Sequence, residues 1–145
     1  MVVFFDTSVL VSASVQAHRH FVQASAALAR VTGGKDKGFI SQHSIAEVYA
    51  ALTRIPVVPR IHPLEAARII RSNFLQNFDT VGVVEDDYLE AMKTVSDSGW
   101  PGAKIYDALL LRCAEKCPVQ RIYTFNLRDF KQLAPAHLQH MICAP

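Results

Sequence analysis

Apolar runs along the chain predict a series of short buried strands. VVFF at residues 2–5 is an apolar run without a polar break, which is typical of a strand that is covered on both faces. Similar β-rich runs follow at intervals that leave room for helices between them. The further predicted strands are GFIS at 38–41, TVGVV at 80–84, RIYTF at 121–125 and a last short strand near 139–143.

The segments between these runs have helical periodicity. In SQHSIAEVYAALTR, Ile45, Val48, Tyr49 and Leu52 fall at positions i, i+3, i+4 and i+7, which places them on one helical face. The other predicted helices cover 18–32, ended by two glycines, about 62–76, a segment from Asp86 to Gly99, and about 103–116.

The order of these elements predicts the fold class. Strands that alternate with helical crossovers form a mainly parallel sheet with helices on both faces. We therefore expect an α/β fold, a three-layer α/β/α sandwich around a mainly parallel sheet of about five strands. In such sheets the active crevice lies at the carboxyl ends of the strands.

Composition indicates one globular domain over residues 1–145. Half of the residues are hydrophobic and 19% are charged, and the sequence contains no repeat or long linker. No apolar stretch approaches the ~20 residues of a membrane span, and the first residues lack the basic lead-in of a secretory signal. We therefore expect a cytoplasmic protein without membrane contact.

The net charge and the cysteine and histidine residues do not indicate a particular function. The formal net charge of +2 is too small to establish a nucleic-acid partner. Cys113, Cys117 and Cys143 have no zinc-binding spacing, which favours reduced structural thiols. His18 and His20 share no helical face, so we assign no metal to them.

Asp6 ends the first apolar run and has two open interpretations. An Asp, Thr or Ser after a strand often caps the next helix. A carboxylate at the end of a parallel strand also points toward the expected crevice. Both roles are compatible, because Thr7 or Ser8 can cap while Asp6 faces the crevice.

Asp107 is harder to explain as a structural residue. Its helix, AKIYDALLLRCA, is apolar on nearly every face, and a carboxylate is rarely buried without a partner. An ion pair with Lys104, three residues earlier, is one explanation, and a metal ion is the other.

Two further polar groups are ambiguous in isolation. Glu47 lies off the apolar stripe of its helix, as a solvated glutamate near Arg54 would. Asn126 and Asp129, in TFNLRDF, have the spacing of a helix cap and its first-turn partner. Motifs for dinucleotides, for a phosphate-binding loop and for a serine nucleophile are absent, so a hard divalent cation held by carboxylates fits the inventory best.

Taken in order, FFDTSVL, SQHSIAEVYAALTR, KIYDALLLRCA and TFNLRDF resemble a PIN domain, and more narrowly a VapC-type toxin of bacterial toxin–antitoxin pairs. The resemblance covers almost the whole chain. It implies an α/β/α sandwich and a ribonuclease that requires Mg²⁺, which Mn²⁺ can replace. It also implies an RNA substrate, a small cognate antitoxin and a homodimer. Our expected antitoxin groove involves the helices near 42–54 and 62–76.

The resemblance assigns roles residue by residue. The first, second and third acids of the family correspond to Asp6, Glu47 and Asp107. Direct metal contact is expected for Asp6 and Asp107, and contact through water for Glu47 and Asp129. The supporting polar residues are expected at Thr7, Ser8, Thr124 and Asn126. The chain departs from the four-acid pattern because Asn126 stands where the fourth acid is expected, with Asp129 three residues on.

Two other functions stay open at this point. One is a metal-dependent phosphohydrolase with Asp6 as covalent nucleophile, although Ser8 stands where that chemistry usually has a second carboxylate. The other is a PIN fold that binds RNA or protein without cleavage, which the Asn126 departure supports.

Overall fold

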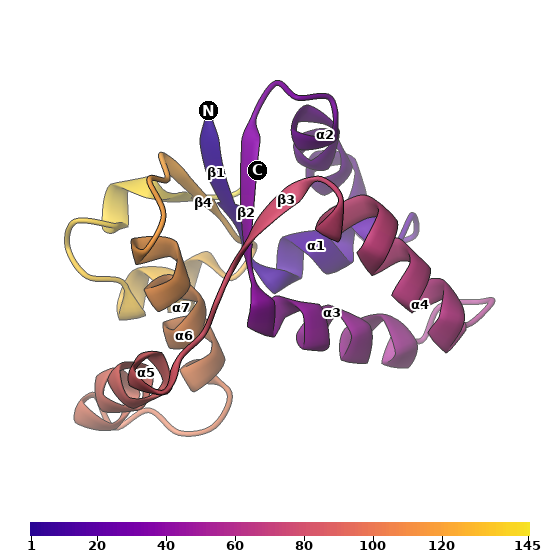
Figure 1. Ribbon diagram of the computed structural model, residues 1–145. Helices are drawn as coiled ribbons and strands as arrows, with labels where there is room; N and C mark the ends of the chain where they lie inside the picture. The colour runs from indigo at the N-terminus through magenta and orange to yellow at the C-terminus, as the bar shows by residue number, and fades with distance from the viewer.

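A five-stranded sheet lies at the centre of the computed structural model, which describes residues 1–145 (Figure 1). All neighbouring strands are parallel, and their order across the sheet is β3-β2-β1-β4-β5. The expected α/β/α sandwich with a parallel sheet is therefore confirmed. The strands are β1 (Val2–Phe5), β2 (Lys37–Ser41), β3 (Phe78–Val81), β4 (Arg121–Tyr123) and β5 (Ile142–Cys143).

Seven α-helices cover the two faces of the sheet. Figure 1 shows α1 to α4 on one side of the strands and α5 to α7 on the other. The helices are α1 (Thr7–Ser14), α2 (Phe21–Thr32), α3 (Gln42–Arg54), α4 (Pro63–Ile69), α5 (Glu85–Asp97), α6 (Lys104–Glu115) and α7 (Leu127–Leu133), with a π-helical segment at Ile70–Leu75 and a 3₁₀ turn at Gln139–Met141.

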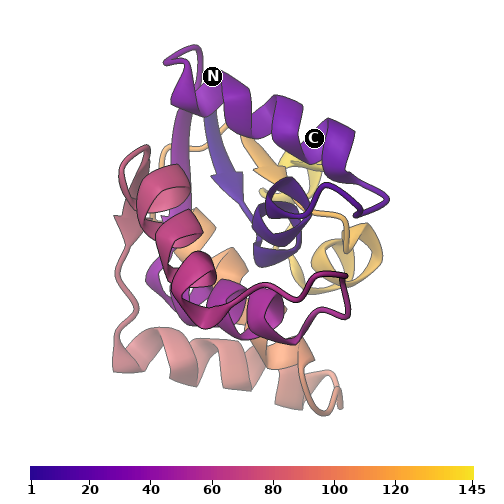
Figure 2. The ribbon, with the colours of Figure 1, turned by 90° about the vertical axis from the view of Figure 1, so that its right-hand side faces the viewer.

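The unbroken apolar run of β1 supplies both layers of the core. Successive side chains of a strand point to opposite faces. Val3 and Phe5 accordingly pack with α1 to α4, the layer that faces the viewer in Figure 2, whereas Phe4 packs with α5 to α7. All three side chains are fully buried, so β1 is the central strand that the apolar run predicts.

The chain after β1 differs from the predicted helix over 18–32. An extra helix, α1, begins directly after Asp6, and the second helix begins only at Phe21. His18 to His20 form a turn instead, in which the His20 backbone N–H donates to His18 Nδ1 at 3.2 Å. The Ser- and Val-rich sequence of α1 has weak helix propensity, and packing of Val9 and Leu10 in the core stabilises it.

Other predicted boundaries are wrong as well. The strand expected over 121–125 ends at Tyr123, and the one expected near 139–143 covers only 142–143, because 139–141 form a 3₁₀ turn. The third strand is 78–81, not 80–84, because the buried Phe78 fixes its register against Gly38 of β2. A Cβ at Gly38 would lie 2.5 Å from the Phe78 ring, so only glycine allows this approach. The predicted helix at 62–76 is divided into α4 and the π-helical segment.

The topology places one crevice at the ends of β1 and β4. From β1 the chain moves to β2 and β3 on one side, and then crosses to β4 and β5 on the other. Ligands of open α/β sheets bind where the strand order reverses in this way. Asp6 follows β1 and Thr124 follows β4 at this point. None of the helices combines the length and apolar character that crossing a bilayer requires.

Candidate active site

Asp6 is buried at the carboxyl end of β1 and does not act as a helix cap. It stands at the N-cap position of α1, but its side chain makes no capping hydrogen bond. Its Oδ2 instead accepts hydrogen bonds from Ser8 Oγ at 2.5 Å and Thr124 Oγ1 at 2.7 Å. The residue is only 3% exposed, and burial raises the pKa of its carboxyl, while the two hydroxyls oppose this shift.

Asp107 projects from the first turn of α6 toward the same crevice. The predicted alternative of an ion pair with Lys104 is wrong, because Lys104 Nζ lies 3.4 Å from Asp129 Oδ1 and donates to Gln132 Oε1 at 2.9 Å. Asp107 Oδ2 accepts a hydrogen bond from Asn126 Nδ2 at 2.8 Å. Burial, followed by the charges of neighbouring acids, raises the pKa of Asp107 to about 7. These acids are Asp6, Asp129 and Glu47.

Glu47 joins these acids from α3. Its Oε1 accepts a hydrogen bond from Thr7 Oγ1 at 3.2 Å and lies 3.7 Å from His43 Nε2. It forms no ion pair with Arg54, and burial raises its pKa. The interpretation of Glu47 as a freely solvated surface glutamate is therefore wrong.

The turn after β4 connects the acids through Asn126. Its Nδ2 donates to Asp107 Oδ2 at 2.8 Å and to Asp129 Oδ2 at 3.2 Å. Its backbone N–H donates to Thr124 Oγ1 at 2.9 Å, and that hydroxyl in turn donates to Asp6. The side chain of Asn126 makes no capping hydrogen bond, so the interpretation of this turn as an ordinary helix cap is wrong.

The acids line a continuous depression in the surface. A cavity of about 470 Å³ is bounded by Asp6, Glu47, Asp107 and Asn126 among other residues. A neighbouring recess of about 360 Å³ shares the last three of these and adds Asp129. As the side chains stand, no group of three or more His, Cys, Asp and Glu residues is arranged to hold a metal ion. The acids are nevertheless close enough that their charges add to burial in raising the pKa of Asp107.

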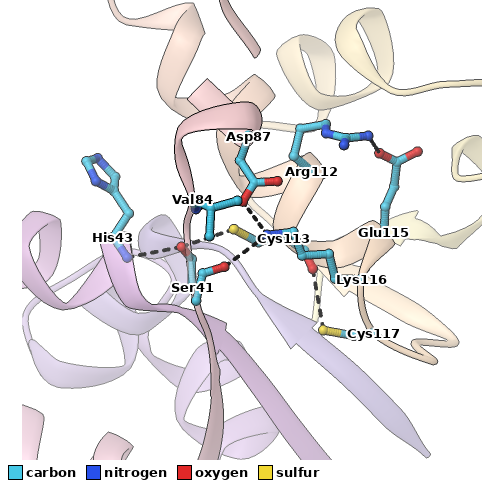
Figure 3. Close-up of polar contacts among 10 residues, drawn as sticks. Ser41, His43, Val84, Asp87, Arg112, Cys113, Glu115, Lys116 and Cys117 are labelled. Atoms are coloured by element: carbon cyan, nitrogen blue, oxygen red, sulfur yellow. Dashed lines mark hydrogen bonds and ion pairs between the residues drawn. The ribbon is translucent and has the colours of Figure 1, made fainter. Parts of the chain in front are cut away.

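The other buried acids of the chain, unlike Asp6, pair with cationic groups. Asp87 is 2% exposed and contacts the Lys116 ammonium, which joins α5 to α6 (Figure 3). Asp36 is 6% exposed and contacts both Arg30 and the N-terminal ammonium. Asp6 is equally buried, but it forms no ion pair with a lysine, an arginine or a histidine. Because buried charges are normally paired, the site fits a bound cation that would compensate Asp6 and Asp107.

A comparison with protein families matches the PIN domain over residues 3–135. The chain belongs to the PIN-domain family. The resemblance inferred from the four sequence segments is thereby confirmed. No curated protein sequence matches the chain.

Solved structures share the fold of this PIN domain. One is VapC20 from Mycobacterium tuberculosis, described as a sarcin–ricin loop cleaving toxin, with a TM-score of 0.68 and 21% identity over 90% of this chain and 93% of that chain. Another is VapBC2 from Rickettsia felis bound to a DNA fragment from their promoter, with a TM-score of 0.61 and 17% identity over 92% and 93%. At these identities the similarity establishes the fold.

The cavity of this PIN domain also includes residues that the sequence did not indicate. His18, Arg19 and His20, in the turn between α1 and α2, line it together with Phe125. Ser44 of α3 accepts a hydrogen bond from Thr7 Oγ1 at 3.1 Å. No sequence pattern marks these contacts, because they join segments that are distant along the chain.

Proposed function

We propose that this chain is a metal-dependent endoribonuclease of the VapC type, the toxin of a toxin–antitoxin pair. The observation that carries the proposal is Asp6, a buried carboxylate that no cationic side chain pairs with, at the carboxyl end of β1 in a cavity that Glu47 and Asp107 also line. Membership of the PIN-domain family and the shared fold of a toxin that cleaves the sarcin–ricin loop support it.

In this proposal Asp6 and Asp107 hold Mg²⁺ directly, and Glu47 and Asp129 bind it through water. Carboxylate oxygens are the ligands that Mg²⁺ prefers, and Mg²⁺ commonly keeps several waters. When bound, the ion supplies positive charge to the phosphodiester oxygens and a water of lowered pKa as nucleophile. Mn²⁺ is expected to replace it.

The polar residues around the acids orient them. Ser8 and Thr124 fix Oδ2 of Asp6, which leaves the other carboxylate oxygen for the cation. Asn126 holds Asp107 and Asp129 at a common position, and Thr7 holds Glu47. Such supporting hydrogen bonds set the direction of ligand lone pairs before an ion binds.

The proposed antitoxin would bind a groove between α3 and α4. This groove has a volume of about 640 Å³ and mainly apolar walls, and it lies on the two helical segments that the sequence suggested. The shared fold of VapBC2 from Rickettsia felis, whose structure was solved bound to a promoter DNA fragment, supports such a partner. The lining residues are Gln42, Ile45, Ala46, Tyr49, Ala67, Ile70, Arg71, Leu75 and Thr80.

The decisive experiment is cleavage of a sarcin–ricin loop RNA and of an unstructured RNA by the purified chain. Cleavage should require Mg²⁺ or Mn²⁺ and stop in EDTA. Asp6→Asn and Asp107→Asn should each lower the rate by at least about 100-fold. Asp97→Asn, which changes an exposed acid on α5, is the matched control and should leave the rate unchanged.

Two results would contradict the proposal. Full metal-dependent activity in both Asp6→Asn and Asp107→Asn would exclude these acids from catalysis. Calorimetry that detects no Mn²⁺ binding to the wild-type chain, together with an absence of cleavage, would favour a PIN fold that binds without cutting.

A further inference from the structure

The turn between α1 and α2 brings basic and imidazole side chains to the acidic cavity. His18, Arg19 and His20 line the same cavity as Asp6 and Glu47. Arg19 is exposed, whereas both histidines are half-buried. A surface that carries donors beside a cluster of carboxylates is suited to an anionic ligand that extends past the acids, such as a nucleic-acid strand.

Arg19 is available for such a ligand because it has no partner within the protein. Lys104, the cation beside Asp129, is already engaged, since it donates to Gln132 and lies 4.2 Å from the centre of the Trp100 ring. Arg30 and Arg112 likewise form ion pairs. Arg19 forms no hydrogen bond or ion pair, although acids line the cavity it borders.

His18 adds a second donor of defined tautomer. Its Nδ1 accepts a hydrogen bond from the His20 backbone N–H, so the proton of the neutral ring is on Nε2. Burial, followed by the charges of His20 and Arg19, lowers the pKa of His18 and favours this neutral form. The Nε2–H group is therefore a donor and not an acceptor.

A stacked pair of rings fixes this turn relative to the acids. The His20 and Phe125 rings are 4.1 Å apart and 9° from parallel. Phe125 directly precedes Asn126, and its backbone N–H donates to Ser8 Oγ, which itself contacts Asp6. The turn is thus connected to the same group of residues that orients the carboxylates, so its position relative to the acids is defined.

We propose that Arg19, with the Nε2–H group of His18, binds a backbone phosphate of the RNA strand next to the phosphate that is cleaved. The guanidinium group donates two parallel hydrogen bonds to phosphate oxygens, and its charge offsets the repulsion between the strand and the acids. This inference rests on the proposed ribonuclease function. It makes Arg19 and His18 substrate-positioning residues, separate from the expected metal ligands.

The test is RNA binding, measured by fluorescence anisotropy with a labelled single-stranded RNA at several KCl concentrations. All proteins carry Asp6→Asn and are measured in Mg²⁺, so that the RNA stays uncleaved, which a gel verifies. The double variant with Arg19→Ala should bind the RNA about tenfold more weakly than Asp6→Asn alone at low salt. The slope of log K against log[salt] should become shallower by about 0.7, the value for one lost phosphate contact on a single strand.

Matched variants separate this role from a general effect of charge. Arg121→Ala removes an exposed arginine at the amino end of β4, the end of the strand opposite to the crevice. It should change neither the RNA affinity nor the salt slope. Arg19→Lys should restore the salt slope but only part of the affinity, because an ammonium group cannot form the two-pronged contact. His18→Ala should weaken binding with little change in slope, since the ring is neutral.

The outcomes distinguish this inference from the proposed function. Equal affinity and slope for Arg19→Ala and Arg121→Ala would overturn the inference, while metal-dependent cleavage by the wild type would leave the ribonuclease proposal standing. Conversely, a shallower slope in Arg19→Ala without cleavage by the wild type would support a phosphate contact and contradict the ribonuclease function. Circular dichroism of each variant verifies that it is folded.

Discussion

Replacement of Asp107 by asparagine is expected to stabilise the metal-free protein at neutral and alkaline pH. Burial, together with the charges of the neighbouring acids, raises the pKa of Asp107 from 3.8 to about 7, so its ionised form is unfavourable in the folded state. Asparagine removes the charge but keeps an oxygen that can accept the hydrogen bond from Asn126 Nδ2. The variant therefore loses the repulsion without leaving a donor unpaired.

The sign of the pH dependence follows from the direction of the shift. Between about pH 4 and 7 the folded protein keeps the proton of Asp107, whereas the unfolded chain has lost it. The free energy of unfolding contributed by this group therefore falls as the pH rises through this window, and it is constant above about pH 7. The advantage of Asp107→Asn should be absent near pH 4 and complete near pH 8.

The magnitude follows from the pKa and the exposure of the side chain. A shift from 3.8 to about 7 corresponds to roughly 4 kcal/mol for a group fully removed from water. Asp107 is only partly buried, so solvent screens the repulsion, and we expect a gain of about 1–2 kcal/mol.

Urea denaturation in EDTA at pH values from 4.5 to 8.5 measures this effect. The difference between Asp107→Asn and wild type isolates the contribution of Asp107 from those of other acids. Asp97→Asn, an exposed acid paired only with Lys93, should stay within about 0.5 kcal/mol of wild type throughout. A variant no more stable than wild type at pH 8.5, or equally stabilised at pH 4.5, would refute the reasoning.

Three further predictions concern other contacts. Thr124→Val removes the hydroxyl that donates to Asp6 and should lower RNA cleavage about 10- to 100-fold with an unchanged circular dichroism spectrum. Gly38→Ala places a Cβ 2.5 Å from the Phe78 ring and should destabilise the fold by about 2–3 kcal/mol in urea denaturation. Asp36→Asn removes the buried carboxylate of an ion pair with the half-exposed Arg30 and should cost about 2 kcal/mol at pH 7. Because the pKa of Asp36 is about 2, this cost should disappear as the pH falls from about 4 toward 2, which thermal unfolding at several pH values can detect.

The fold could be predicted where apolar patterns are long or unbroken. The apolar run at 2–5 predicts the central strand, and the apolar stripe that begins at Ile45 predicts α3. Helix α1 could not be predicted, because TSVLVSAS has weak helix propensity and tertiary packing determines its conformation. The boundary of β3 depends on Phe78 packing against Gly38, which lies forty residues earlier in the sequence.

The candidate site could be predicted in part. Asp6 and Asp107 could be identified from the sequence because a carboxylate in an apolar segment is rare. Glu47 could be identified only by resemblance to the family. Nothing in the sequence indicates that Arg19 lines the same cavity as Asp6. That placement depends on how α1 and the following turn are positioned relative to the ends of β1 and β4, and such long-range arrangements leave no periodic pattern.

The amide at Asn126 explains how the site can depart from a four-acid pattern and still suit a cation. A carboxylate only accepts hydrogen bonds when ionised, so an aspartate at this position would add a charge beside Asp107, whose pKa is already about 7. Asn126 instead donates to both Asp107 and Asp129 from one nitrogen. The asparagine therefore adds no charge beside Asp107 in the metal-free protein and links two carboxylates, and in the proposed metal site Asp129 would supply the fourth acidic group.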